Sequence, residues 1–83
     1  MNRAVVLTAR AQRDLTRLDK AVAVRVIQAL ERLAESGRGD VRRLKGTTCR
    51  EWRLRVGDWR VRFALERDRL VVLRILPRGA AYR

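Results

Sequence analysis

Histidine is absent from this sequence, and three other residue types are rare: the chain has only Cys49, Pro77, Lys20 and Lys45. The absence of histidine excludes a zinc site and a histidine-based acid–base pair within the chain. A single cysteine allows no intrachain disulfide, which suits a reducing compartment, so we expect a cytoplasmic protein without metal or cofactor. The apolar run at residues 4–7 is too short for a signal peptide or a membrane span, so we expect no membrane association.

Acidic residues are also scarce. The chain has 9 Asp and Glu against 21 Lys and Arg, which gives a formal net charge of +12. Such a charge attracts nucleic acid, an anionic membrane or an acidic protein. Almost all of the bases are arginines, whose planar guanidinium can hold a phosphate with two hydrogen bonds. Hydrophobic residues make up 47% of the 83 residues, so we expect a single folded domain over residues 1–83.

The stretch from residue 50 to residue 63 alternates between apolar and basic side chains. One parity holds Trp52, Leu54, Val56, Trp59, Val61 and Phe63, and the other holds Arg53, Arg55, Arg60 and Arg62. Successive side chains of a strand point to opposite faces, so the pattern predicts a β-hairpin with one apolar and one basic face. Gly57-Asp58 is typical of a two-residue hairpin turn.

This turn fixes which arginines face each other. If Val56 pairs with Trp59, two arginine pairs lie opposite each other: Arg55 with Arg60 and Arg53 with Arg62. Like charges in such positions destabilise a sheet, which favours a polyanionic partner for this face. The alternative is a basic face that is simply solvated. The two tryptophans could stack on bases, but their parity favours a place in the core.

The remaining pattern predicts an α+β fold. We expect a strand at residues 4–7, a helix from the N-cap Thr8 to about Leu18, and a second helix from Asp19 to about Ser36, ended by Gly37. The helices should form an antiparallel hairpin on one face of the sheet. A polar connector at residues 37–49 then leads to a three-stranded antiparallel meander near residues 50–56, 59–65 and 70–76, which completes one sheet with the first strand.

The turn around residues 66–69 has two readings. A four-residue loop would place Arg74 on the apolar face, whereas a three-residue loop would place it on the basic face. Because the burial of an unpaired charge is costly, we predict the three-residue loop.

The order of these elements, with Arg-Leu-Lys-Gly at 43–46, the segment 52–63, and Arg78 followed by Tyr82, resembles the RelE/ParE superfamily of type II toxins over nearly the whole chain. The RelE-like branch is favoured. The resemblance implies a toxin held inactive by an acidic cognate antitoxin, in a complex that could be a heterotetramer. RelE-type toxins are ribosome-dependent endoribonucleases that cut mRNA without a metal and so inhibit translation. ParE-type toxins inhibit gyrase and do not cut RNA.

The resemblance also implies site residues. By position, the catalytic cluster falls on Arg53, Arg55, Arg60, Arg78 and Tyr82, and we add as RNA-binding residues Arg62, Lys45, Arg43 and Arg74. Some RelE-type enzymes have lysines where Arg53 and Arg55 stand, and arginine does not readily lose a proton. The general base therefore stays open between Tyr82 and, as the second choice, Glu51. A nucleic-acid-binding module without toxicity is a third possibility.

Overall fold

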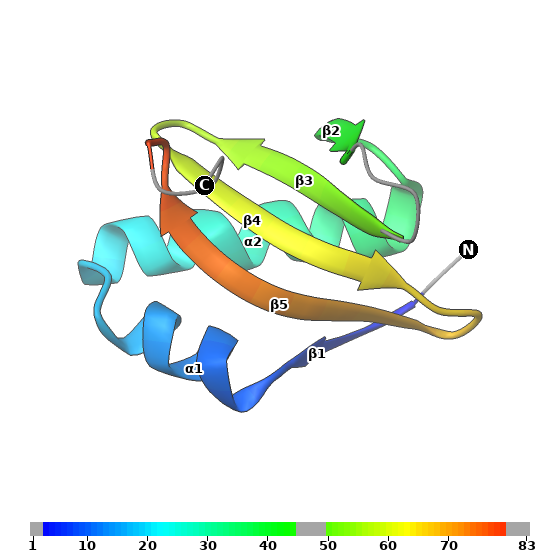
Figure 1. Ribbon diagram of the computed structural model, residues 1–83, viewed down its shortest axis with the longest axis horizontal. Helices are drawn as coiled ribbons and strands as arrows, with labels where there is room; N and C mark the ends of the chain where they lie inside the picture. The colour runs from blue at the N-terminus through cyan, green and yellow to red at the C-terminus, as the bar shows by residue number, and fades with distance from the viewer. Residues whose placement is uncertain (1–2, 45–49, 80–83) are drawn as a thin grey trace.

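The computed structural model describes residues 3–44 and 50–79. Its elements are β1 (Ala4–Leu7), α1 (Ala9–Thr16), α2 (Lys20–Ser36), β2 (Asp40–Arg43), β3 (Glu51–Val56), β4 (Trp59–Leu65) and β5 (Arg69–Pro77). The strands form one sheet in the order β1-β5-β4-β3-β2, in which β1 is parallel to β5 and the other neighbours are antiparallel. Figure 1 shows α2 behind the sheet and α1 beside β5. The predicted α+β fold is confirmed.

The first helix begins where the sequence predicted. The Thr8 hydroxyl accepts a hydrogen bond from the Ala11 amide at 3.1 Å, which satisfies one of the free donors of the first turn. The helix ends at Thr16, two residues before the predicted end. No helix in the described part of the chain is long and apolar enough to cross a membrane.

The second helix spans the sheet. Its buried stripe includes Val26, Leu30 and Leu33, at helical spacing. Gly37 ends it with a left-handed φ of 74°, and the Gly37 amide donates to the Leu33 carbonyl at 2.8 Å. Asp19 stands at the N-cap position but makes no capping hydrogen bond with its side chain.

The core lies between the helices and one face of the sheet. Its buried members are Ala11, Val26, Leu30, Leu33, Ala34, Leu54, Val61, Phe63, Leu70, Val72 and Ile75. The hairpin residues among them all have the parity predicted for the apolar face. Trp52 and Trp59 are partly buried and pack against this core, as their parity favoured.

The predicted hairpin is confirmed in detail. Val56 pairs with Trp59 across a turn in which Gly57 has a φ of 58°, a value that glycine adopts at little cost. The two arginine pairs lie opposite each other as expected, Arg55 with Arg60 and Arg53 with Arg62.

Strand β2 was not predicted. The residues assigned to a connector, 37–49, include Asp40–Arg43, which pairs with β3 at the edge of the sheet. Its four residues carry only one apolar side chain, Val41, so no alternation signals a strand. Short, charged edge strands of this kind protect a sheet against pairing with other chains.

The loop prediction between β4 and β5 was wrong, although the face predicted for Arg74 was right. Leu65 pairs with Leu70, so four residues separate the paired positions. A bulge then shifts the register: Phe63 pairs with Val72, whereas Arg62 pairs with Arg74. The extra residue in β5 turns Arg74 to the face of Arg62.

Helix α1 covers the edge of β5 beyond the end of β1. The Asp14 carboxylate accepts hydrogen bonds from the Ile75 amide at 2.9 Å and from Arg74 Nε at 2.8 Å. Burial tends to raise the pKa of Asp14, but the hydrogen bonds from Arg74 and Ile75 hold it below its ordinary value. Asp14 therefore acts as an ionised cap on an otherwise open strand edge.

Candidate functional site

The sheet face opposite the helices contains a depression of about 380 Å³, which we call the arginine concavity. Strands β2, β3 and β4 and the residue after β5 contribute its lining, which consists of Asp40, Arg42, Arg53, Arg55, Arg60 and Arg78. Five of these six side chains are cationic. The lining brings together residues that are far apart in the sequence.

Arg60 is the buried member of the concavity, with 4% of its surface exposed. Its Nη1 donates to the carbonyls of Gly57 at 2.8 Å and Trp59 at 3.0 Å, so the hairpin turn fixes its guanidinium. Its Nε is buried without a hydrogen-bond partner among the described residues. A buried donor without a partner is costly, and an anion at this place would lower that cost.

The electrostatics of Arg60 also favour an anion beside it. Burial lowers its pKa, and the charges of the neighbouring arginines 55, 53 and 78 lower it further, while Asp40 acts in the opposite direction. Arginine stays protonated in spite of such a shift. The lowered pKa therefore reports a positive potential in a poorly solvated place, which is a favourable setting for a phosphodiester.

The end of β5 is held next to the hairpin turn. The Arg78 amide donates to the Asp58 carbonyl at 2.9 Å, which places Arg78 at the concavity although it follows the last strand. Four of the five residues predicted as catalytic, Arg53, Arg55, Arg60 and Arg78, therefore line one depression. The fifth, Tyr82, lies outside the described residues.

Two of the arginines predicted to bind RNA are compensated within the chain. Arg62 forms an ion pair with Glu51, and Arg74 pairs with Asp14, whose hydrogen bond raises the pKa of Arg74. Neither arginine lines the concavity. Their RNA contacts stay predictions. The pairing of Glu51 also ties up the carboxylate that was the second choice for the general base.

The remaining predicted RNA-binding residues are on or near β2. Arg43 lies over the ring of Trp52, with its guanidinium carbon 6.0 Å from the ring centroid, at the range of a cation–π contact. It does not line the concavity. Lys45 lies outside the described residues. The RNA contacts of both stay predictions.

Sequence reasoning missed Asp40 and considered Arg42 only as an RNA-backbone contact of the connector, outside the catalytic cluster. Both belong to β2, where Asp40 pairs with Arg55 and Arg42 with Arg53, so the overlooked strand adds two charges to the site. The spacing of Asp40 and Arg42 by two residues was the available signal, since it puts both on one face of a strand. Asp40 is the single carboxylate among the described residues that line the concavity.

The arrangement can bind and polarise a phosphodiester. Fixed guanidiniums can hold the scissile phosphate and stabilise the charge that develops on it. Within residues 3–44 and 50–79, no group of three acidic or cysteine side chains could hold a metal ion. Among the concavity's described side chains, Asp40 is the only carboxylate, and the others are guanidiniums, which have no acceptor.

Solved structures share this fold over almost its whole length. The RelE–RelB complex from Pyrococcus horikoshii has a toxin chain with 27% sequence identity and a TM-score of 0.79, over 95% of this chain and 98% of that one. The RelBE2 complex from Mycobacterium tuberculosis matches with 22% identity and a TM-score of 0.81, over 94% and 100%. A YoeB/ParE toxin from Agrobacterium tumefaciens matches with 18% identity and a TM-score of 0.73, over 89% and 96%.

A family model assigns the chain to a protein family, which the fold alone does not do. The model described as "ParE toxin of type II toxin-antitoxin system, parDE" matches residues 5–82. No curated protein matches the chain. The fold and the family match define a small toxin of the RelE/ParE superfamily. The chain belongs to the ParE toxin family of type II toxin–antitoxin systems.

Proposed function

We propose that this toxin is a metal-independent endoribonuclease that cuts mRNA on the ribosome and thereby inhibits translation. The observation that supports it is the convergence of Arg53, Arg55, Arg60 and Arg78 on one depression, with the guanidinium of Arg60 buried. Four cations around one space are suited to a phosphodiester and to the extra charge of its pentacovalent transition state.

The reaction requires a base and a stabilised leaving group. The 2′-hydroxyl loses its proton and its oxygen bonds to phosphorus, while the bond from phosphorus to the 5′-oxygen breaks, which leaves a 2′,3′-cyclic phosphate and a 5′-hydroxyl. We assign the base to Tyr82, whose ordinary pKa of about 10 nearby arginines would lower. Asp40 is the second candidate because it lines the concavity. Arg78 would stabilise the leaving oxygen, which then takes a proton from water.

An acidic antitoxin is the partner that the charge favours. A net charge of +12 on 83 residues attracts an anionic protein, and the similar structure from Mycobacterium tuberculosis is described as a toxin–antitoxin complex. We propose that a cognate antitoxin of this kind binds the toxin and covers the concavity, and that their complex could be a heterotetramer. Ribosome and mRNA are the partners of the free toxin, and the cytoplasm is its place of action.

Gyrase inhibition is the second candidate function. The family model that matches residues 5–82 is that of ParE toxins, and ParE-type toxins act on gyrase without cutting RNA. In that case the basic face would contact gyrase or its DNA, and Tyr82 would have no catalytic role.

A translation extract programmed with a defined mRNA separates the two functions. We expect the wild-type toxin to produce codon-positioned cuts with 2′,3′-cyclic phosphate ends, and Arg55→Gln and Tyr82→Phe to lose most of them. Because Arg55 is exposed, we expect its substitution to change the site and to leave the fold intact. Intact mRNA together with inhibited supercoiling in a gyrase assay would assign the toxin to gyrase.

A further inference from the structure

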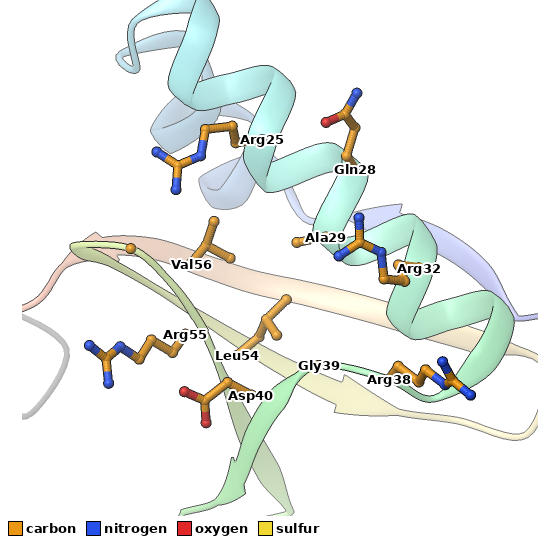
Figure 2. Close-up of a pocket in the computed structure, with 11 residues that line it drawn as sticks. Arg25, Gln28, Ala29, Arg32, Arg38, Gly39, Asp40, Leu54, Arg55 and Val56 are labelled. Atoms are coloured by element: carbon orange, nitrogen blue, oxygen red, sulfur yellow. The ribbon is translucent and has the colours of Figure 1, made fainter.

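A second basic depression lies on the other side of β3, between this strand and α2 (Figure 2). This helix-side groove has a volume of about 310 Å³. Its rim carries four arginines, and its floor is small and apolar. The rim residues are Arg25, Arg32, Arg38 and Arg55, and the floor residues include Ala29, Leu54 and Val56.

Among the residues that the structure describes, none forms an ion pair with the groove's cations from α2 and from the segment before β2. Arg25, Arg32 and Arg38 are exposed, and none of them takes part in an ion pair within the described residues. Asp40 is the one carboxylate among the described residues that line the groove. The helix-side groove therefore has the property that distinguishes the arginine concavity, an excess of guanidiniums around one space, and it favours an anionic ligand.

The hairpin turn lines the groove and also holds a residue of the concavity. The Gly57 carbonyl accepts the hydrogen bond from Arg60 Nη1 at 2.8 Å, on the side of the concavity. On the side of the groove, a Cβ added to Gly57 would lie 3.3 Å from Arg25 Nη2. Arg25 therefore lies, on the side of the groove, beside the turn residue that holds Arg60 in the concavity.

The end of β3 offers a passage between them. Strand β2 pairs with β3 only up to the Asp40–Arg55 pair, so Val56 and Gly57 extend beyond it. Figure 2 shows Leu54 and Val56 directed toward α2 and Arg55 directed away from it. Arg55 and Asp40 line both depressions. A flexible anionic chain can therefore leave the concavity over Arg55 and enter the groove without crossing β2.

We propose that a single strand of nucleic acid follows this passage: one phosphodiester occupies the arginine concavity, and the helix-side groove binds the strand farther along, with Arg25 and Arg32 as phosphate ligands. The inference rests on the proposed function, because it takes the ligand of the concavity as a phosphodiester. A polynucleotide has a regularly spaced negative charge along a flexible backbone, which a continuous basic surface binds. The apolar floor accommodates a sugar or a base.

The length of the ligand provides the test. Fluorescence anisotropy would measure the affinity for 2′-O-methyl RNA, which cannot be cleaved, at lengths of about 4 and about 12 nucleotides, the range that single-strand-binding domains cover. The test variant is Arg25→Gln/Arg32→Gln. The matched control is Arg10→Gln/Arg13→Gln, which removes two exposed charges from α1 that line neither depression.

We expect the test variant to bind the longer RNA about tenfold more weakly, while its affinity for the shorter RNA changes little. For the longer RNA, the slope of log affinity against log salt concentration should become less steep by about 0.7 per lost phosphate contact. The control should change both affinities by less than about twofold, since distant charges are screened. An equal loss in the control, or an equal loss for both lengths, would overturn the proposal.

Two further results separate this inference from the nuclease proposal. If the toxin leaves ribosome-bound mRNA intact but the test variant still shows the length-dependent loss of RNA affinity, the proposal for the groove stands and the nuclease proposal fails. A glutamate-rich peptide that displaces the longer RNA from the wild type, but binds the test variant poorly, would reassign the groove to an acidic protein segment and overturn the proposal.

Discussion

The basic face of the sheet consists of two regions with different electrostatics. Toward β5, Arg62 and Arg74 each contact a carboxylate of their own, Glu51 and Asp14. Toward the hairpin turn, the described lining of the concavity has five arginines and one carboxylate, Asp40. The comparison teaches that an arginine on this face is not by itself a sign of a binding site: the paired arginines contact carboxylates of the fold, and the excess of arginines near the turn is where we propose that an external anion binds.

The largest expected effect is on RNA cleavage. Arg55→Gln removes an exposed cation from the concavity, and we expect a loss of about 10²-fold in cleavage rate, the size found when one transition-state donor is removed. Arg62→Gln removes the same charge from the paired region, and its loss should be less than about threefold. Cleavage of ribosome-bound mRNA by the two variants measures the contrast. Equal losses would break the distinction between the regions.

The second effect is on folding stability. Asp14→Asn should lower the free energy of unfolding by about 2 kcal/mol, because a charged hydrogen bond to Arg74 and a hydrogen bond to the Ile75 amide are weakened at a buried position. Asp19→Asn is the control, since Asp19 is exposed and makes no capping bond with its side chain. Urea unfolding monitored by circular dichroism measures both. A control as unstable as the test variant would refute a special role for Asp14.

The same carboxylate predicts a pH dependence. The pKa of Asp14 is lowered in the folded protein, so its contribution to stability is fully present above the unfolded value of about 3.9 and is lost as the pH falls through the lower folded value. The difference in unfolding free energy between wild type and Asp14→Asn should be constant at neutral pH and shrink below about pH 4. A difference that grows on acidification would contradict the lowered pKa.

The hairpin and the helices could be predicted from the sequence because each has a strong local signal. Alternation over residues 52–63 predicts the register and three arginines of the concavity, Arg53, Arg55 and Arg60, and Thr8 and Gly37 predict helix ends. Strand β2 lacks such a signal, since it has one apolar side chain and forms only because β3 offers an edge.

The pairing of the arginines also escaped prediction, for a different reason. Asp14 and Arg74 are 60 positions apart, and they meet only because α1 replaces β1 at the edge of β5. The bulge in β5, between Val72 and Arg74, is likewise a compromise. It keeps the core residues Val72 and Ile75 inward while Arg74 stays on the basic face. Patterns of neighbouring residues do not predict such features, because these depend on contacts between distant parts of the folded chain.

The smallest effect concerns the turn between the two depressions. Gly57→Ala should destabilise the protein by about 1 kcal/mol, because the φ of 58° is unfavourable for a residue with a Cβ. The new Cβ would also lie 3.3 Å from Arg25 Nη2, so the Arg25 guanidinium must shift by a few tenths of an ångström. We therefore expect this variant to bind longer RNA more weakly than its modest loss of stability explains, and its thermal unfolding and RNA affinity measure the two parts. Gly37→Ala is the matched control: Gly37 also has a positive φ, of 74°, but a Cβ there would contact nothing within 4 Å. An equal loss of RNA affinity in both variants would show that strain, and not the position of Arg25, governs the binding.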